Sequence, residues 1–428
     1  MNSICCIGLG RLGLLFANIL AKYNTKVYGF DINNEIPNII KYNKKSLEPK
    51  LNYLIKKNKN KFFFEKNFTK IISETSSAFI IVPTPSMKNH AFDNQYILSS
   101  LDKICEQLHD KSKYVINITS TVNPGSCNFF INYIEKKYNL KHGKQFVLTY
   151  NPHLIALGSI YENVLNPDLV IIGSDLKYGH QYLNKLYKKI YKKKVDRVKF
   201  LNLKEAEISK IAINTFITLK ISYANTISQI TDNEKKINSA KILEAIGTDS
   251  RIGKKYLSLG ALFSGPCFPR DNLSFVNYLK KKKVLTDIPL ATEKINNFQI
   301  KRYIKCFDNN KRFLNKKRIT IGICGLSYKS NTDLSTSSPG ILLKNYFKKK
   351  YKVIIHDLHN SYIEKKINFY PNINNFFNKS DVIFLCYKNN NFKKIEKLPS
   401  SKNKLIIDLW DFIKIKKKNI ILKKIGIN

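Results

Sequence analysis

The sequence predicts an α/β protein in which two Rossmann-like parallel-sheet domains are joined by a central helical domain. Up to about residue 199, short apolar runs alternate with helix-length segments, which is the pattern of βαβ units and a parallel sheet. The same alternation returns near Arg318. Between the two blocks, from Leu203 to about Phe307, long helical patterns replace it.

These blocks set the expected domain boundaries. A Rossmann domain spans residues 1–200, a helical domain 201–310 and a second sheet domain 315–428. A chain of 428 residues exceeds what one hydrophobic core usually serves, so each domain is expected to bury its own core.

The expected strands are apolar runs. In the first block they are 4–7, 26–30, 78–82, 114–118 and 169–172. In the second block they are 319–324, 353–355, 382–386 and 405–407. The longest helical pattern begins the middle block at 204–228.

The composition indicates a soluble, cytoplasmic protein. No apolar run reaches the roughly 18 residues that a membrane-spanning helix requires. Glycines interrupt the apolar first twenty residues, so we interpret them as a buried strand and a phosphate loop instead of a signal peptide. Eight cysteines without paired spacing indicate reduced thiols in a cytosolic compartment.

The formal net charge of +43 is typical of proteins that bind nucleic acids or anionic membranes. Lysine, however, is scattered along the whole chain together with an excess of Asn, Ile, Tyr and Phe, as an AT-rich coding bias would produce. Lysine runs such as Lys280 to Lys283 lack arginine and interleaved aromatics, so we interpret them as solvated faces. We therefore expect no nucleic-acid or membrane partner, although a positive field would attract a nucleotide diphosphate.

A glycine motif, Gly8-Leu9-Gly10-Arg11-Leu12-Gly13, follows the first apolar run. Gly8 would make the tight turn, Gly10 would let the backbone approach a pyrophosphate, and Gly13 would pack helix on strand. Asp31 ends the next strand, where a carboxylate accepts hydrogen bonds from the adenosine ribose and repels a 2′-phosphate. The motif predicts dinucleotide binding with NAD favoured over NADP; the plainer alternative is a glycine-rich turn.

A second motif, Ser264 to Asp271, holds a cysteine between a glycine and two prolines. With Arg270 nearby and Asp271 four residues on, Cys267 has the setting of an activated nucleophile. The alternatives are that Cys267 is an inert packing residue and that Asp271 only N-caps the segment that follows.

A third motif lies at the start of the middle block. Lys210 and Asn214 are four residues apart, so they share one helix face with mostly apolar neighbours. Burial there would make Lys210 a functional charge. The alternative is a snorkelling side chain.

Taken in order, these motifs resemble the UDP-glucose/GDP-mannose dehydrogenase family, and the likeness covers nearly the whole chain. In the first domain it is also carried by Val82-Pro83-Thr84-Pro85, Ser120-Thr121-Val122 with Pro124-Gly125, and Asn151-Pro152 with Ile155 to Gly158. Later it is carried by Glu205 to Asn214, Asp249 to Gly253, Gly265 to Asp271, Gly325 to Lys329, Asn331-Thr332-Asp333 and Ser338-Pro339-Gly340.

The resemblance implies an NAD-dependent oxidation of the C6 alcohol of a nucleotide-bound hexose to the uronic acid. Cys267 would attack the C6 aldehyde to give a thiohemiacetal, and a second hydride transfer would yield a thioester that water cleaves. Lys210 would stabilise oxyanions and Asn214 would hold the reacting oxygen or a water. Asp271 would manage protons with Lys210, and Thr121 would order water beside the nicotinamide.

The resemblance also implies the binding residues and a homodimer formed through the helical domain. NAD would contact Gly8, Gly10, Arg11, Leu12, Gly13, Asp31, Pro83, Thr84 and Thr121. The nucleotide sugar, most simply UDP-linked, would contact Leu154, Ile155, Lys210, Asn214, Gly265 and Lys329, and Arg251 would reach it across the dimer. No metal site is expected.

The sequence departs from the family pattern at two places. His153 stands where the Asn-Pro-Glu pattern has a glutamate associated with thioester hydrolysis. Histidine has an unperturbed pKa of about 6.5 and would activate water only when neutral. If His153 faces the thioester, hydrolysis is therefore expected to slow as pH falls through the pKa of His153; the alternative is a tolerated polar residue. Thr336, Ser337 and Leu334 replace residues that are often charged, which bears on the identity of the substrate.

Two rival interpretations stay open. A 6-phosphogluconate-type β-hydroxyacid dehydrogenase shares a Rossmann domain and a helical middle, but it does not account for the third domain or Cys267. A catalytically impaired nucleotide-binding homologue, disabled at His153, would have no reason to keep Lys210, Asn214, Cys267 and Asp271 together.

Overall fold

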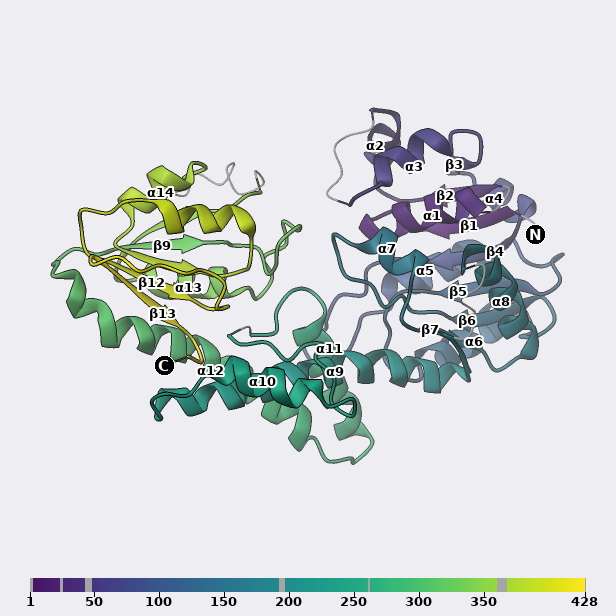
Figure 1. Cartoon of the computed structure of the whole chain (residues 1–428). Coiled ribbons are helices and arrows are strands. Elements are labelled where there is room, and N and C mark those ends of the chain that lie inside the picture. The colour runs from purple at the N-terminus through teal and green to yellow at the C-terminus, as the bar shows by residue number, and fades with distance from the viewer. Residues whose placement is uncertain are drawn as a thin grey trace. The chain divides into compact units, whose positions relative to one another are not determined.

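The computed structural model describes residues 3–23, 26–42, 48–191, 197–260, 262–359 and 368–427. The chain forms two compact units, Met1–Ala212 and Ile213–Asn428, and each unit contains one sheet (Figure 1). The long helix α9 (Leu203–Gln229) belongs to both units, because it begins in the first and ends in the second.

The first unit is built on an eight-stranded sheet in the order β3-β2-β1-β4-β5-β6-β7-β8. Its strands are β1 (Ser3–Ile7), β2 (Val27–Phe30), β3 (Phe62–Phe64), β4 (Thr75–Ile80), β5 (Tyr114–Ile118), β6 (Phe146–Tyr150), β7 (Val170–Gly173) and β8 (Val198–Leu201). Neighbouring strands run parallel except β6 and β7. Strand order reverses between β1 and β4, and doubly wound sheets bind ligands outside the carboxyl ends of the strands at such a point.

Two groups of helices cover this sheet. In one group α1 (Arg11–Tyr23) packs against α3 (Leu51–Lys57), α7 (Ile160–Leu165) and α8 (Lys177–Tyr191). In the other, α5 (Gln95–Cys105) packs against α4 (Phe68–Glu74) and α6 (Ser126–Tyr138), while the short α2 (Ile36–Tyr42) follows β2. Leu15 and Ile19 of α1 lie in the core because their spacing of four puts them on one helix face.

The sheet of the second unit is parallel throughout, in the order β10-β9-β11-β12-β13. Its strands are β9 (Thr320–Cys324), β10 (Lys352–His356), β11 (Val382–Leu385), β12 (Lys404–Asp408) and β13 (Ile420–Lys424). Successive residues alternate between two buried faces. Val382 and Phe384 share a core with α12 (Asp287–Asn310) and α13 (Pro339–Phe347), whereas Ile383 and Leu385 share one with α14 (Ile373–Lys379) and the 3₁₀ helix η5 (Asn390–Lys397).

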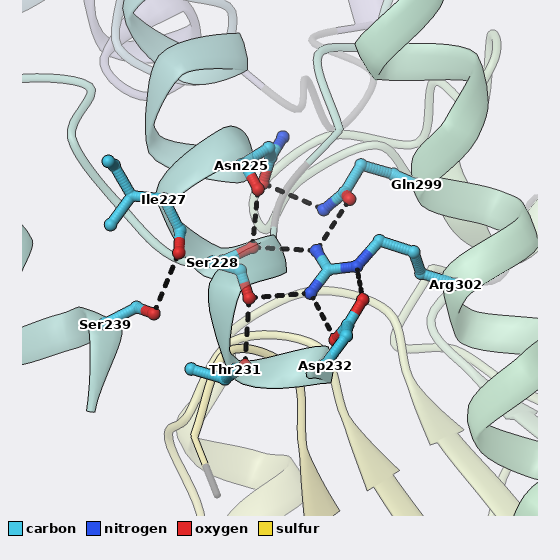
Figure 2. Close-up of polar contacts among 8 residues, drawn as sticks. All are labelled: Asn225, Ile227, Ser228, Thr231, Asp232, Ser239, Gln299 and Arg302. Carbon is cyan, nitrogen blue, oxygen red and sulfur yellow. Dashed lines mark hydrogen bonds and ion pairs between the residues drawn. The ribbon is translucent and has the colours of Figure 1, made fainter. Parts of the chain in front are cut away.

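A buried arginine joins α12 to the end of α9 and to η2 (Ile230–Asp232), as Figure 2 shows. Arg302 donates to the Asp232 carboxylate at 2.6 and 2.8 Å, to Oγ and the carbonyl oxygen of Ser228, and to the side chain of Gln299. All five guanidinium N–H groups are thereby satisfied, as burial of this charge requires. Because α12 also packs on the second sheet, this contact helps to place the end of α9 in the same unit as that sheet.

The predicted fold class is confirmed. The predicted strands correspond to β1, β2, β4, β5, β7 and β9 to β12, whereas β3, β6, β8 and β13 were not predicted. The helical residues after 212 share a compact unit with the second sheet, and the predicted boundaries near 200 and 310 stay a prediction. Within the part of the chain that the structure describes, no helix is long and apolar enough to span a bilayer.

Candidate active site

The glycine loop lies at the carboxyl end of β1. Gly8 has a φ of +90°, and a Cβ at this residue would lie 2.4 Å from the carbonyl oxygen of Ile81. A Cβ at Gly13 would lie 1.8 Å from the carbonyl oxygen of Gly8, so α1 packs on the loop only because residue 13 is glycine. At Gly10, by contrast, no heavy atom of the described residues lies within 4 Å of the Cβ position, which leaves the close approach that a pyrophosphate needs.

Asp31 supports this loop from the end of β2. Its Oδ2 accepts a hydrogen bond from the backbone N–H of Leu9 at 2.5 Å, and its Oδ1 accepts one from Asn33 at 2.7 Å. Asp31 therefore combines a local structural contact with the position from which it would meet the adenosine ribose. Exchange of Asp31 for alanine would remove both the hydrogen bond to the glycine loop and the carboxylate that would meet the ribose.

We expect Asp31→Asn to relax the preference for NAD over NADP, because the amide oxygen still accepts from Leu9 while the charge that repels a 2′-phosphate is gone. The ratio of kcat/KM for NAD to that for NADP should fall by about fivefold or more, since like charges a few Å apart repel by about 1 kcal/mol even in water. Steady-state kinetics with both cofactors measure this ratio. An unchanged ratio would contradict the ribose role of Asp31.

The loops after β4 and β5 are joined to one another. The Thr84 hydroxyl donates to the carbonyl oxygen of Thr121 at 2.8 Å. Ser120 Oγ accepts from the N–H of Val82 at 2.9 Å and donates to its carbonyl oxygen at 2.7 Å. Pro83, Thr84 and Thr121 therefore lie together at the carboxyl edge of the sheet, on the β4 side of the glycine loop.

His153 follows β6 and faces inward. Its ring packs edge-on against Phe16 at 4.4 Å between centroids, and its Nε2 lies 3.5 Å from the Tyr187 hydroxyl. His153, Leu154 and Ile155 line a cavity of about 20 Å³, roughly the space of one water molecule. Burial, together with the positive charge of Lys210, lowers the pKa of His153 from its ordinary value to about 4. Protonation of His153 is therefore expected near pH 4 and not near the unperturbed value, and its role in hydrolysis stays a prediction.

From this shift we expect no inflection from His153 in thioester hydrolysis between about pH 5 and 9, because the imidazole is neutral throughout. The free energy of unfolding, by contrast, should depend on the protonation of His153. The unfolded chain, with a His pKa of about 6.5, binds the proton more readily than the native chain, so the free energy of unfolding falls as pH drops from there toward 4. His153→Gln should remove this component in urea unfolding measured across that range. Coincident pH profiles for the variant and the wild type would contradict the shift.

Helix α9 carries the predicted lysine and asparagine. Lys210 is 8% exposed and Asn214 is 7% exposed, so both side chains are buried, as is that of Lys404 in the second sheet. The Asn214 amide donates to Oδ2 of Asp271 at 2.6 Å. Asp271 is buried, lies in the first turn of α11 (Phe268–Lys281), and has Arg270 Nε 3.4 Å from its other oxygen. The structure thus brings Asn214 and Asp271 together as a buried pair.

Cys267 is the N-cap residue of α11, at the positive end of the helix dipole. Of the eight cysteines Cys267 is exposed, Cys306 is partly buried and the other six are buried. The carbonyl oxygen of Cys267 accepts the N–H of Asp271 at 2.8 Å, so Cys267 and Asp271 share one helical turn.

The cysteine loop is joined to the turn after β9. The N–H of Gly265 donates to the carbonyl oxygen of Thr336 at 2.9 Å, and a Cβ at Gly265 would lie 2.8 Å from the Tyr328 ring. Lys329, with its ammonium 5.5 Å from the centre of the Tyr328 ring, continues the same turn. Arg251 lies outside this group: its side chain is 87% exposed and forms a two-pronged ion pair with Asp249.

The second sheet repeats the geometry of the first at this edge. The N–H of Leu326 donates to Oδ2 of Asp357 at 2.6 Å, as Leu9 does to Asp31. A Cβ at Gly340 would lie 2.1 Å from the carbonyl oxygen of Gly325, as at Gly13 and Gly8. Asp357 was not predicted from the sequence, although its place directly after β10, like that of Asp31 after β2, is a signal for it.

A cavity of about 280 Å³ also opens in the second unit, near the carboxyl ends of β11 and β12. Its lining includes Lys254, Leu257, Lys388, Trp410 and Asp411. The Lys388 ammonium lies 5.6 Å from the centre of the Trp410 ring, and the indole N–H is held by the carbonyl oxygen of Cys386. An aromatic face beside two lysines suits a base and a phosphate. None of these residues was predicted from the sequence, although Trp410 is the only tryptophan and follows a strand.

The first sheet carries a glycine loop that fits a dinucleotide, and the second sheet has a similar edge. An exposed cysteine lies in a loop joined to the turn after β9. Together these features are those of a cofactor-dependent dehydrogenase. Comparison with known families agrees with this class. Three domain models of the UDP-glucose/GDP-mannose dehydrogenase family match: the NAD binding domain at residues 2–191, the central domain at 204–298 and the UDP binding domain at 322–415. The chain belongs to the UDP-glucose/GDP-mannose dehydrogenase family.

Individual proteins show the same relationship. The chain is 28% identical to UDP-glucose 6-dehydrogenase of Rickettsia typhi, over 99% of this chain and 98% of that protein. The structure of a UDP-glucose dehydrogenase from Pyrobaculum islandicum superimposes with a TM-score of 0.88 at 23% identity, over 100% of this chain and 98% of that one. A UDP-D-ManNAc dehydrogenase from Pyrococcus horikoshii gives 0.86 at 22% identity, over 99% of both chains. The chain is an NAD-dependent nucleotide-sugar 6-dehydrogenase, an oxidoreductase that acts on CH–OH groups.

Proposed function

We propose that this chain oxidises the C6 alcohol of a UDP-linked hexose or N-acetylhexosamine to the uronic acid through a thioester on Cys267. The observation that carries the proposal is the placement of Cys267, an exposed thiol at the start of α11 and one helical turn from Asp271, which is paired with Asn214. Bound NAD supplies the hydride acceptor for each of the two oxidations.

In this proposal different residues of the chain transfer protons, stabilise charge and position water. The C6 alcohol first loses hydride to give the aldehyde, and the thiolate of Cys267 adds to that aldehyde. The resulting thiohemiacetal loses a second hydride to become the thioester, which water hydrolyses to the uronic acid and the free thiol. Lys210 stabilises the oxyanions, and Asn214 holds the reacting oxygen or a water. Asp271 exchanges protons together with Lys210, and Thr121 orders water beside the nicotinamide. Pre-positioned charge of this kind commonly contributes several kcal/mol to catalysis.

Several loops supply the residues that we propose bind the substrate. Leu154 and Ile155 follow β6, while Gly265 and Lys329 belong to the joined cysteine loop and β9 turn. We assign the nucleotide to the cavity beside Trp410, where the indole face suits uracil and the lysines suit a diphosphate. UDP-glucose and UDP-N-acetylmannosamine are the first sugars to test, because similar proteins are named for them.

We further propose a homodimer formed through the helices of the second unit. Large apolar side chains are exposed there, with Phe216 and Tyr223 of α9 at 62% and 51% and Ile288 of α12 at 64%. Phe216 and Tyr223 are seven residues apart and so share one face of α9. Association over such a surface would bring Arg251, which is exposed, toward the partner's nucleotide sugar.

The proposed compartment is the cytoplasm, where thiols such as Cys267 stay reduced.

A panel of nucleotide sugars tests the proposal. The chain is mixed with NAD and, separately, UDP-glucose, UDP-N-acetylmannosamine, UDP-N-acetylglucosamine and GDP-mannose, and NADH absorbance and product mass are recorded. We expect NADH and a uronic acid with a UDP-linked sugar. NADH from 6-phosphogluconate alone would favour the β-hydroxyacid alternative. NAD binding without NADH from any substrate would favour the impaired homologue.

A further inference from the structure

Glu207 is a fully buried carboxylate on α9, three residues before Lys210. Its Oε2 accepts the backbone N–H of Gly125 at 2.5 Å, and its Oε1 accepts that of Cys127 at 2.7 Å. Both donors belong to the start of α6, where N–H groups have no partner within the helix. Glu207 therefore caps α6 from a helix about eighty residues later in the sequence.

Helix α6 has no side chain of its own at the N-cap position. Its N-cap residue is Gly125, with a φ of +96°, which has no side chain to satisfy the first-turn N–H groups. A serine or aspartate at an N-cap normally does so locally, and acidic residues near a helix N-terminus also meet the positive end of the dipole. Here the anion comes from α9 instead. As a consequence α6 and α9 cannot shift independently without leaving a buried carboxylate unpaired.

The segment fixed in this way carries Thr121. Gly125 ends the loop after β5 that begins at Thr119, and the Thr121 carbonyl oxygen in that loop accepts a hydrogen bond from the Thr84 hydroxyl. Glu207 thus connects the helix of Lys210 with the loop of Thr121, and through Thr84 with the loop after β4.

We propose that Glu207 is a positioning residue for the dehydrogenase reaction, which sets the placement of Lys210 relative to the Thr121 loop. This inference rests on the proposed function, since it gives Lys210 and Thr121 their roles. Glu207 would act through these residues and would not itself touch the reacting atoms. The carboxylate is needed because each of its two oxygens accepts one N–H.

Glu207→Gln is the most direct test. The amide keeps the shape but offers one acceptor oxygen and an NH₂ that would face a backbone N–H donor. We expect kcat for NADH formation to fall by roughly ten- to a hundredfold, since small displacements of positioned groups cost that much, while KM for NAD and for the UDP-sugar stays within about twofold. Amide hydrogen exchange of residues 120–127 should become faster. Glu207→Asp, which keeps both acceptor oxygens on a shorter stem, should recover part of kcat.

Asp381→Asn is the matched control. Asp381 is a buried carboxylate that also accepts a backbone N–H, from Thr320 at 2.9 Å, but it lies at the amino end of β11, at the edge opposite the turn after β9. We expect this variant to lower the melting temperature and to leave kcat unchanged.

Two results would overturn the inference. One is a Glu207→Gln enzyme with wild-type kcat, whether or not its melting temperature falls as in Asp381→Asn. The other is unchanged amide exchange at Thr121 and Val122. If the wild-type chain forms no NADH with any sugar, the proposed function fails; the exchange experiment then decides alone whether Glu207 holds the Thr121 loop.

Discussion

Replacement of Cys267 by serine is expected to lower the rate of uronic acid formation on the order of a thousandfold or more. A hydroxyl at this position lacks the nucleophilicity of a thiolate, so the covalent route to the acid is lost. Binding should be nearly unaffected, because sulfur and oxygen differ little in size and the backbone contacts of the loop remain. Steady-state NADH formation, product mass and titrations with NAD and UDP-sugar measure the two parts of this expectation.

Cys306→Ser provides the matched control for that experiment. Cys306 lies on α12 and is partly buried, and nothing in the proposed mechanism uses it. This variant should keep wild-type turnover. If Cys267→Ser also turned over like the wild type, the chemistry would have to lie elsewhere in the chain.

Substitution of Gly13 by alanine is expected to have the second-largest effect. The new Cβ would lie 1.8 Å from the carbonyl oxygen of Gly8, so the glycine loop would have to move away from α1. We expect NAD affinity to fall on the order of a hundredfold and stability to fall by about 1–3 kcal/mol, as for other overpacked sites. Fluorescence titration with NAD and thermal unfolding measure these changes.

Gly10→Ala separates binding from packing at the same loop. The described residues leave the Cβ position of Gly10 open, so the melting temperature should be unchanged. NAD binding should still weaken, because the added methyl group occupies the side from which the pyrophosphate approaches. A Gly10→Ala chain that bound NAD as tightly as the wild type would place the pyrophosphate elsewhere.

Much of the fold could be predicted because its central strands are buried on both faces and form apolar runs, as in Val382 to Leu385. The missed strand β6 (Phe146–Tyr150) carries this signal and was overlooked, whereas the missed strands β3, β8 and β13 are short or contain or adjoin lysines. β13, for example, is Ile420-Ile421-Leu422-Lys423-Lys424 at a sheet edge, directly after the run Lys416 to Lys418. Only its partner β12 identifies that segment as a strand.

The candidate site, like the fold, has residues that could be predicted from the sequence and residues that could not. Cys267 and the glycine loop were found because their chemistry is local, in the spacing of a few residues. Glu207 was missed because its partners Gly125 and Cys127 lie about eighty residues earlier, and nothing in the sequence around it marks the contact. The low pKa of His153 likewise depends on burial and on Lys210, both of which arise only in the folded chain.

The ratio of NADH to uronic acid tests the central claim most directly. An alcohol that becomes a carboxylate through a covalent thioester gives up two hydrides, so about two NADH should appear for each acid formed with the preferred UDP-sugar. NADH is counted by absorbance and the acid by mass spectrometry in the same reaction. A ratio of two, with no free aldehyde, is the predicted result. A ratio of one, with the aldehyde as the released product, would contradict the four-electron oxidation through Cys267.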